Sequence, residues 1–204
     1  MKKENKKILF ISYSQYGHLT DHYKISNLLS EYFEIDFLCL NENKIKIQSK
    51  NVNVIYIDKS KRLNILNFTY NCLKHLKHHK GEYSLIFVVH FQLAFILPLI
   101  LFKNKWISDI RTLSVHKSCV LRTIKNLILF FTTFCYKHIT VIDAEIAKKI
   151  FLKKYHVLPL GSDKIGFSIK NFEELNLLYI GTLNNRNLEV VIDGIKLFLD
   201  LNKT

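Results

Sequence analysis

The sequence has few of the residues that interrupt helices and strands: it contains two prolines and six glycines among 204 residues. This scarcity excludes a collagen-like chain and argues against a disordered or loop-rich one. Acidic residues are also few, with 17 Asp and Glu against 30 Lys and Arg, which gives a net charge of +13. Such a charge favours an acidic partner, whether a phosphorylated ligand, nucleic acid or an anionic membrane face, and does not choose among them.

Cysteine is present without any metal-binding or redox spacing. The chain has no CxxC pair, and its four cysteines lie in apolar segments: Cys39, Cys72, Cys119 and Cys135. We therefore expect buried, reduced thiols and a cytoplasmic protein. The basic start, MKKENKKILFISYS, has too short an apolar run for a signal peptide.

One apolar run, LIFVVHFQLAFILPLILF at residues 85–102, approaches the length of a membrane-spanning helix. His90 and Gln92 break its middle, Pro98 lies in its second half, and β-branched residues concentrate in its first half. These features favour a buried strand at 85–89 followed by a buried helix at 91–102 over a membrane span.

Strand and helix patterns alternate along the chain. Strands rich in Ile, Val, Leu and Phe are predicted at 7–13, 33–40, 52–57, 85–89, 106–110, 138–142 and 155–158. Helices are predicted at 18–32, 63–79, 91–102, 116–136 and 144–153. Apolar strands with little polar alternation, joined by helices, predict an α/β fold with a doubly wound, Rossmann-like parallel sheet.

A polar stretch near Gly161 separates this pattern from a second unit. The segment LLYIGTLNNRNLEVVIDGIKLF at 177–198 reads as a strand, a turn at Gly181 and an amphipathic helix. We therefore predict one domain at 1–160, a linker at 161–174 and the start of a second domain at 175–204. A helix that follows a strand through glycine offers unpaired amides to an anion.

The first predicted strand is followed by a polar loop, SYSQYGHLTDH, which leads into a helix. Ligands of doubly wound sheets bind beyond the carboxyl ends of the strands, so Gly17 belongs either to a ligand-binding loop or to a simple turn. The GxGxxG dinucleotide fingerprint is absent. His18 and His22 lie four residues apart, but no third ligand accompanies them, so no metal site is predicted.

Polar residues also follow the fourth and fifth predicted strands. His90 is either a substrate contact or a histidine at the edge of the core. Arg111 and Thr112 stand at the end of the fifth strand, where an arginine could clamp a phosphate or carboxylate. Alternatively, Arg111 pairs with Asp109 within the strand and only ties the loop down.

Two basic segments have weaker functional readings. HLKHHK at 75–80 is predicted to be the solvated end of a helix, and the helix at 116–136 is either a core helix, which we prefer, or one that touches an anionic membrane. No helix-turn-helix, RNA-binding or zinc-finger signature is found, and the basic residues are spread along the chain. Nucleic acid is therefore not expected as a partner.

Six segments occur together in the order of a known enzyme family. They are KILFISYSQYGH, EYSLIFVVHFQLAFILPLIL, KWISDIRTL, HITVIDAEIAKKI, HVLPLGSD and LLYIGTLNNRNLEVVIDGI. Over nearly the whole chain this set resembles the GT-B glycosyltransferases of family 4 (group 1). The resemblance implies two facing Rossmann-like domains, with a nucleotide-sugar donor on the C-terminal one and the acceptor against the N-terminal one.

The resemblance also assigns candidate substrate-binding residues. Gly17, with its neighbour His18, corresponds to the loop that approaches the donor phosphate and sugar. Gly181 matches the glycine beside the donor diphosphate. Thr182 stands where the family often has arginine, so Arg186 becomes the candidate cation for the diphosphate. By their position near the family's reacting centre, Arg111 and Thr112, together with His90, are the candidate catalytic residues.

The implied reaction moves a sugar, with expected retention of configuration, from a nucleotide-diphosphate sugar to a polysaccharide or lipid-linked acceptor. Neither a cofactor nor a metal is expected, and the family's association with the inner membrane face agrees with the basic charge. The family's donor-binding glutamate pair would lie beyond Thr204, so we expect a truncated enzyme that is inactive alone. The alternative is a non-catalytic α/β module that binds a phosphorylated or anionic partner.

Overall fold

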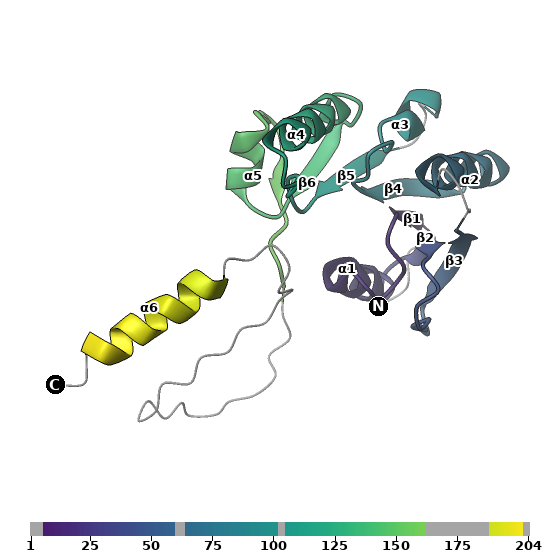
Figure 1. Cartoon of the computed structure of the whole chain (residues 1–204). Coiled ribbons are helices and arrows are strands. Elements are labelled where there is room, and N and C mark those ends of the chain that lie inside the picture. Colours follow the sequence, from purple (N-terminus) through teal and green to yellow (C-terminus); the bar gives the residue numbers. More distant parts are fainter. Residues whose placement is uncertain (1–5, 60–63, 102–104, 162–187, 202–204) are drawn as a thin grey trace. The chain divides into compact units, whose positions relative to one another are not determined.

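The computed structural model describes residues 6–59, 64–101, 105–161 and 188–201 (Figure 1). The chain divides into two compact units, Met1–Ser162 and Asp163–Thr204. The second unit contains the helix α6 (Leu188–Leu201), which confirms the helix predicted at the end of the chain. The predicted linker beyond Gly161 and the strand before Gly181 lie outside the described residues.

The first unit is built on a parallel sheet of seven strands in the order β3-β2-β1-β4-β5-β6-β7. The strands are β1 (Lys7–Ser12), β2 (Glu34–Asn41), β3 (Val52–Asp58), β4 (Tyr83–Val89), β5 (Trp106–Ile110), β6 (His138–Val141) and β7 (His156–Val157). The predicted α/β class and parallel, doubly wound sheet are confirmed. The order reverses direction between β1 and β4, which are neighbours although β2 and β3 separate them in sequence.

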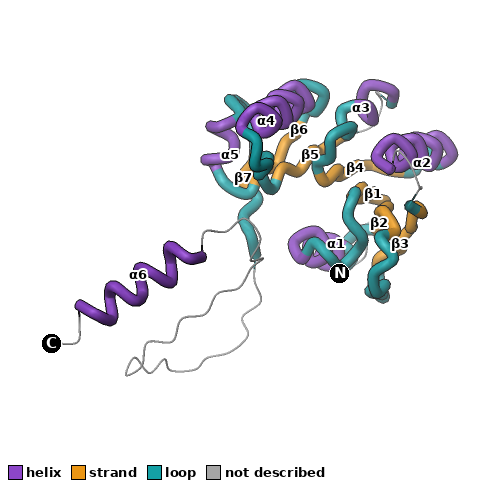
Figure 2. The backbone as a smooth tube through the Cα atoms, in the orientation of Figure 1, coloured by secondary structure: helices purple, strands orange, loops and turns teal. Residues whose placement is uncertain are grey.

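Five helices accompany the sheet. They are α1 (Thr20–Leu29), α2 (Asn64–His78), α3 (Ile96–Ile100), α4 (Cys119–Thr133) and α5 (Ala144–Lys149). Apolar side chains form two cores, one on each side of the sheet. Helices α2 and α3 lie on the opposite side of the sheet from α1 (Figure 2). One core includes Phe68 of α2 and Leu97 of α3, and the other, around Phe10 and Phe37, packs against α1 residues such as Tyr23.

The apolar run at 85–102 forms a strand and a helix, as predicted, but the helix is shorter. It begins at Ile96 instead of residue 91, because the chain after β4 first makes tight turns, with the Ala94 amide donating to the Phe91 carbonyl. Pro98 is tolerated because it lies in the first turn of α3, where amides lack intrahelical partners. No helix in the described part of the chain is long and apolar enough to cross a membrane.

Two predictions about burial are wrong at α4. The sequence predicts a core helix, yet the buried side chains of α4 are Leu129, Thr132 and Thr133, whereas much of its apolar surface is exposed. Cys119, at its start, is exposed and not buried. The other cysteines fit the prediction better: Cys39 and Cys72 are buried and Cys135 is half-buried. Burial raises the pKa of the Cys39 thiol to about 11.

Candidate functional site

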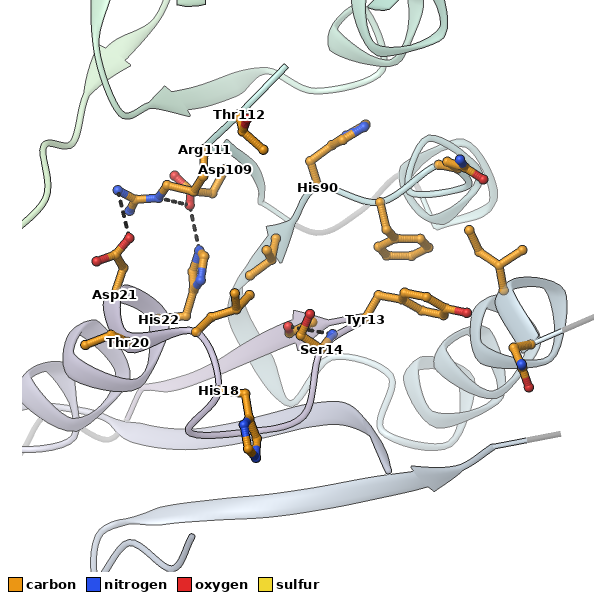
Figure 3. Close-up of a pocket in the computed structure, with 17 residues that line it drawn as sticks. Tyr13, Ser14, His18, Thr20, Asp21, His22, His90, Asp109, Arg111 and Thr112 are labelled. Atoms are coloured by element: carbon orange, nitrogen blue, oxygen red, sulfur yellow. Dashed lines mark hydrogen bonds and ion pairs between the residues drawn. The ribbon is translucent and has the colours of Figure 1, made fainter. Parts of the chain in front are cut away.

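A cavity of about 850 Å³ opens at the carboxyl ends of β1, β4 and β5, where the strand order reverses. We call it the edge pocket (Figure 3). Its lining comes from the loop after β1, the start of α1, the start of α2 and the ends of β4 and β5: Ser12, Tyr13, Ser14, His18, Leu19, Thr20, Asp21, His22, Asn64, Ile65, Val89, His90, Phe91, Gln92, Asp109, Arg111 and Thr112. This is the usual ligand position in a doubly wound sheet.

The loop between β1 and α1 has a conformation that requires glycine. Gly17 has a φ of +86°, and a side chain there would also collide with Ile47. Gln15 ties the loop to the chain after β2, because its amide donates to the Lys44 carbonyl over 3.0 Å. His18 lines the edge pocket and is exposed, and it precedes α1 instead of lying in its first turn. Gly17 does not itself line the pocket.

A buried ionic cluster forms one wall of the edge pocket. Nε2 of His22 lies 2.7 Å from Oδ2 of Asp109, and Nε of Arg111 donates to the same oxygen over 2.6 Å. The Thr140 hydroxyl donates to the other carboxylate oxygen. Burial alone would raise the pKa of Asp109, but the hydrogen bonds from His22 and Thr140 and the charge of Arg111 outweigh it and lower this pKa. Asp109 is therefore ionised at neutral pH.

Arg111 is held on three sides. Besides its bond to Asp109, Nη1 donates to the Leu158 carbonyl over 2.9 Å and lies 4.0 Å from a carboxylate oxygen of Asp21. The Asp109–Arg111 pair, which was the alternative to a ligand clamp, is thus formed. Nη2 of Arg111 is buried and finds no hydrogen-bond partner among the described residues. The guanidinium therefore keeps one unused donor group in the wall of the pocket.

His90 follows β4 and lies beside β5. Its backbone amide donates to the Asp109 carbonyl over 2.9 Å, while Nδ1 of its ring is buried and finds no partner within the described ranges. Burial lowers the pKa of His90 to about 4, so the ring is neutral at physiological pH. Thr112 is exposed at the pocket, and its hydroxyl donates to the Leu113 carbonyl.

The structure thus brings four of the predicted site residues to one pocket: His18, His90, Arg111 and Thr112. The predicted donor-binding residues Gly181, Thr182 and Arg186 lie outside the described residues. Sequence reasoning missed the link between His22 and Asp109, because it considered His22 only as a possible metal ligand with His18. A charged residue inside an apolar strand was the available signal for it.

The clusters of potential ligands do not form a metal site in the described part of the chain. No group of three or more His, Cys, Asp or Glu side chains there could hold an ion. In the segment at 75–80, the His75 ring instead bonds to the Tyr83 hydroxyl over 2.8 Å. The exposed His78 agrees with the predicted solvated helix end.

Comparisons with known proteins find similar folds among solved structures. No protein-family model matches the sequence, and no curated protein matches it. Among solved structures, sucrose-phosphate synthase from Thermosynechococcus elongatus is similar, with a TM-score of 0.58 and 13% identity over 78% of this chain and 49% of that one. HepE from Anabaena, solved in complex with UDP and glucose, has a TM-score of 0.52 and 12% identity over 78% of this chain and 45% of that one.

The first unit shares the Rossmann-like α/β fold of these two glycosyltransferase structures. At these identities the likeness concerns the fold alone. The chain spans about half the length of the two solved structures. The edge pocket lies at the reversal point of this Rossmann-like sheet, and its chemistry depends on the pocket's own residues.

Proposed function

We propose that the chain is the acceptor-side part of a glycosyltransferase of the family 4 type. The enzyme transfers a sugar from a nucleotide-diphosphate sugar to a polysaccharide or lipid-linked acceptor. The observation that carries this proposal is the edge pocket, because polar groups that find no partner among the described residues lie at the reversal point of a sheet like that of the two glycosyltransferase structures. One structural neighbour, HepE, was solved with UDP and glucose, which are the two parts of such a donor.

The polar groups of the edge pocket suit a sugar. Nδ1 of His90 and Nη2 of Arg111 lack partners among the described residues, and a sugar hydroxyl or a phosphate oxygen would satisfy them. The Thr112 hydroxyl adds a third polar group at the same rim. We assign these three residues to the reacting centre, and Gly17 and His18 to the loop that approaches the donor.

The low basicity of His90 favours retention of configuration. An inverting displacement needs a base that removes the acceptor proton, and such a base works best with a pKa near the operating pH. His90, with a pKa of about 4, is a weak base. His22 is the residue that inversion would use instead, because Nε2 is bonded to Asp109 and Nδ1 has no partner among the described residues. The product's anomeric configuration, measured by proton NMR, tests this part of the proposal.

The departing nucleoside diphosphate needs positive charge and amide donors as its own charge develops. In the proposed enzyme Arg186, Gly181 and Thr182 supply them, without a bound metal or other cofactor. We further propose that the enzyme works at the inner face of an anionic membrane. The net charge of +13 supports this placement.

The test uses protein that carries these 204 residues together with a nucleotide-sugar-binding domain. It is incubated with UDP-, GDP- and dTDP-sugars and with soluble or lipid-linked glycans, and release of nucleoside diphosphate is measured. We expect acceptor-dependent release that falls about 100-fold in Arg111→Lys, because loss of one positioned donor costs this much in comparable sites. Lys149→Gln, at an exposed position of α5, is the control and should keep full activity.

Other outcomes would change the assignment. Equal activity of Arg111→Lys and the control would remove Arg111 from the reacting centre. Saturable binding of phosphorylated sugars without transfer to any acceptor would favour the non-catalytic module instead. Rapid transfer by the 204-residue chain alone would contradict the proposal that a second domain is needed to bind the donor.

A further inference from the structure

A second cavity, of about 640 Å³, lies between α4 and the segment that contains α3. We call it the α4 groove. Its walls are mostly apolar and come from residues 92–95 and from one side of α4 and its C-terminal end: Gln92, Leu93, Phe95, Leu121, Ile124, Lys125, Ile128, Phe131, Thr132 and Cys135. Nothing proposed for the edge pocket accounts for this groove.

The exposure of α4 explains why the groove is open. Ile124 is 46% exposed and Phe131 is 62% exposed, although both belong to a long apolar helix. Isolated apolar residues at a surface are normal, but contiguous ones that line a recess mark an interaction site. The groove is therefore a surface that the described part of the chain leaves uncovered.

The α4 groove and the edge pocket both adjoin a third recess. A cleft of about 320 Å³ shares His90, Gln92 and Thr112 with the edge pocket. The same cleft shares Gln92, Lys125 and Ile128 with the groove. The three recesses are therefore adjacent, and the cleft lies between the predicted catalytic residues and the apolar walls of α4.

The cleft and the α4 groove share a positive charge. Among the described residues that line these two recesses, the charged one is Lys125, and the helix that carries it has no acidic residue. Lys125 is half-buried where the cleft meets the groove, and it forms no ion pair with any described residue. An ammonium group at this place suits a phosphate between a polar and an apolar part of one ligand.

We propose that the α4 groove binds the hydrocarbon chain of a lipid-phosphate-linked acceptor. The phosphate lies at Lys125 and the acceptor's sugar lies in the edge pocket. This proposal rests on the proposed function and chooses between its two acceptor classes, since a soluble polysaccharide would gain nothing from an apolar groove. The succession of polar pocket, cation and apolar groove matches a sugar, a phosphate and a hydrocarbon chain in that order.

Two other occupants fit less well. A bilayer surface needs an apolar face but no recess, whereas the groove has a second wall at Leu93 and Phe95. A second copy of the chain packed through α4 would bring the basic residues of both helices together without acidic partners. A single hydrocarbon chain with an anionic head meets neither difficulty.

The test measures binding of farnesyl phosphate to the 204-residue chain by isothermal titration calorimetry. Ile124→Gln places a polar group in the groove wall, and Leu127→Gln makes the same change on α4 outside the groove. The two positions are equally exposed, at 46% and 47%. We expect Ile124→Gln to raise the dissociation constant about tenfold, since apolar contact with the chain is lost, and Leu127→Gln to leave it unchanged.

A second variant tests the phosphate. Lys125→Gln should weaken binding of farnesyl phosphate about fivefold and leave binding of farnesol unchanged, because farnesol has no charge to pair. Absence of farnesyl phosphate binding, or equal effects of Ile124→Gln and Leu127→Gln, would overturn the proposal. Circular dichroism of each variant checks that it is folded.

The same variants identify the other occupants. Equal loss of binding by both glutamine variants to vesicles of phosphatidylglycerol, with no affinity for farnesyl phosphate, would indicate a bilayer contact. A dimer in light scattering that Ile124→Gln dissociates would indicate a second copy. Because farnesyl phosphate binding needs no sugar transfer, it can succeed where the glycosyltransferase assay fails, and fail where that assay succeeds with soluble glycans.

Discussion

Because burial lowers the pKa of His90, this residue should make the folded protein less stable as the pH falls. The structure buries its ring beside the edge pocket and lowers its pKa to about 4. In the unfolded chain the pKa of a histidine is about 6.5. Between these two values the unfolded state binds a proton that the folded state does not. Stability present above about pH 6.5 is therefore lost as the pH falls toward the folded pKa.

The size of the effect follows from the two pKa values. Lowering the pH from about 7 to about 5 costs the folded state roughly 2 kcal/mol through this one group, because each unit inside the window costs ~1.4 kcal/mol. His90→Asn removes the titration and keeps a side-chain amide near the position of Nδ1. The variant should therefore lose about 2 kcal/mol less than the natural protein over the same pH range.

Urea denaturation of both proteins at the two pH values, followed by circular dichroism, measures this difference. Other groups, such as His75, whose pKa burial also lowers, titrate in both proteins and cancel in the comparison. If the two proteins lose the same free energy of unfolding over this pH range, His90 is not held neutral by burial. His90 would then be a stronger base in the edge pocket than we propose, and the support it gives to retention would be lost.

The remaining predictions concern the ionic cluster and the loop after β1. Asp109→Asn leaves the buried Arg111 without its carboxylate partner, so we expect a loss of roughly 3 kcal/mol in the free energy of unfolding, measured with urea at neutral pH. A loss below about 1 kcal/mol would contradict the bonding described for the cluster. Gly17→Ala should cost at least ~1 kcal/mol more than Gly81→Ala: both glycines have positive φ, but only at Gly17 would the new methyl group meet a neighbouring side chain. Equal shifts in the urea midpoints of the two variants would mean that the loop relaxes freely.

The sheet could be predicted well because burial on both faces leaves a strong pattern. The strand Trp106–Ile110 lies inside a parallel sheet, and its predicted bounds agree with those of β5 although Ser108 and Asp109 interrupt its apolar residues. Helix ends were less predictable. The sequence pattern starts α1 at His18, but the loop needs the positive φ of Gly17 and a tie through Gln15, so the helix begins at Thr20. That tie joins residues far apart in sequence, and no local pattern encodes it.

The sequence predicted where the edge pocket lies but not the hydrogen bonds that its residues form. Residues that follow β1, β4 and β5 were candidates because the carboxyl ends of parallel strands meet at one edge. What could not be predicted is that Asp109 accepts hydrogen bonds from α1, β6 and the residue after β5 at once. His22 can pair with Asp109 only because α1 packs against the sheet near β5. These two residues are 87 positions apart, and sequence spacing does not reveal that α1 and β5 are neighbours.

The error at α4 has a different cause, and it bears on the function. A helix whose apolar residues extend around most of its circumference gives the same sequence pattern whether protein or lipid covers the outer side. Leu129 faces the core as expected, while Ile124 and Phe131 remain exposed. The composition of α4 does not tell whether protein or lipid covers its outer side. The residues that surround its exposed side chains give more information. They line a recess that shares Lys125 with the neighbouring cleft at His90, and this order of groups suits the phosphate-linked hydrocarbon chain that we propose.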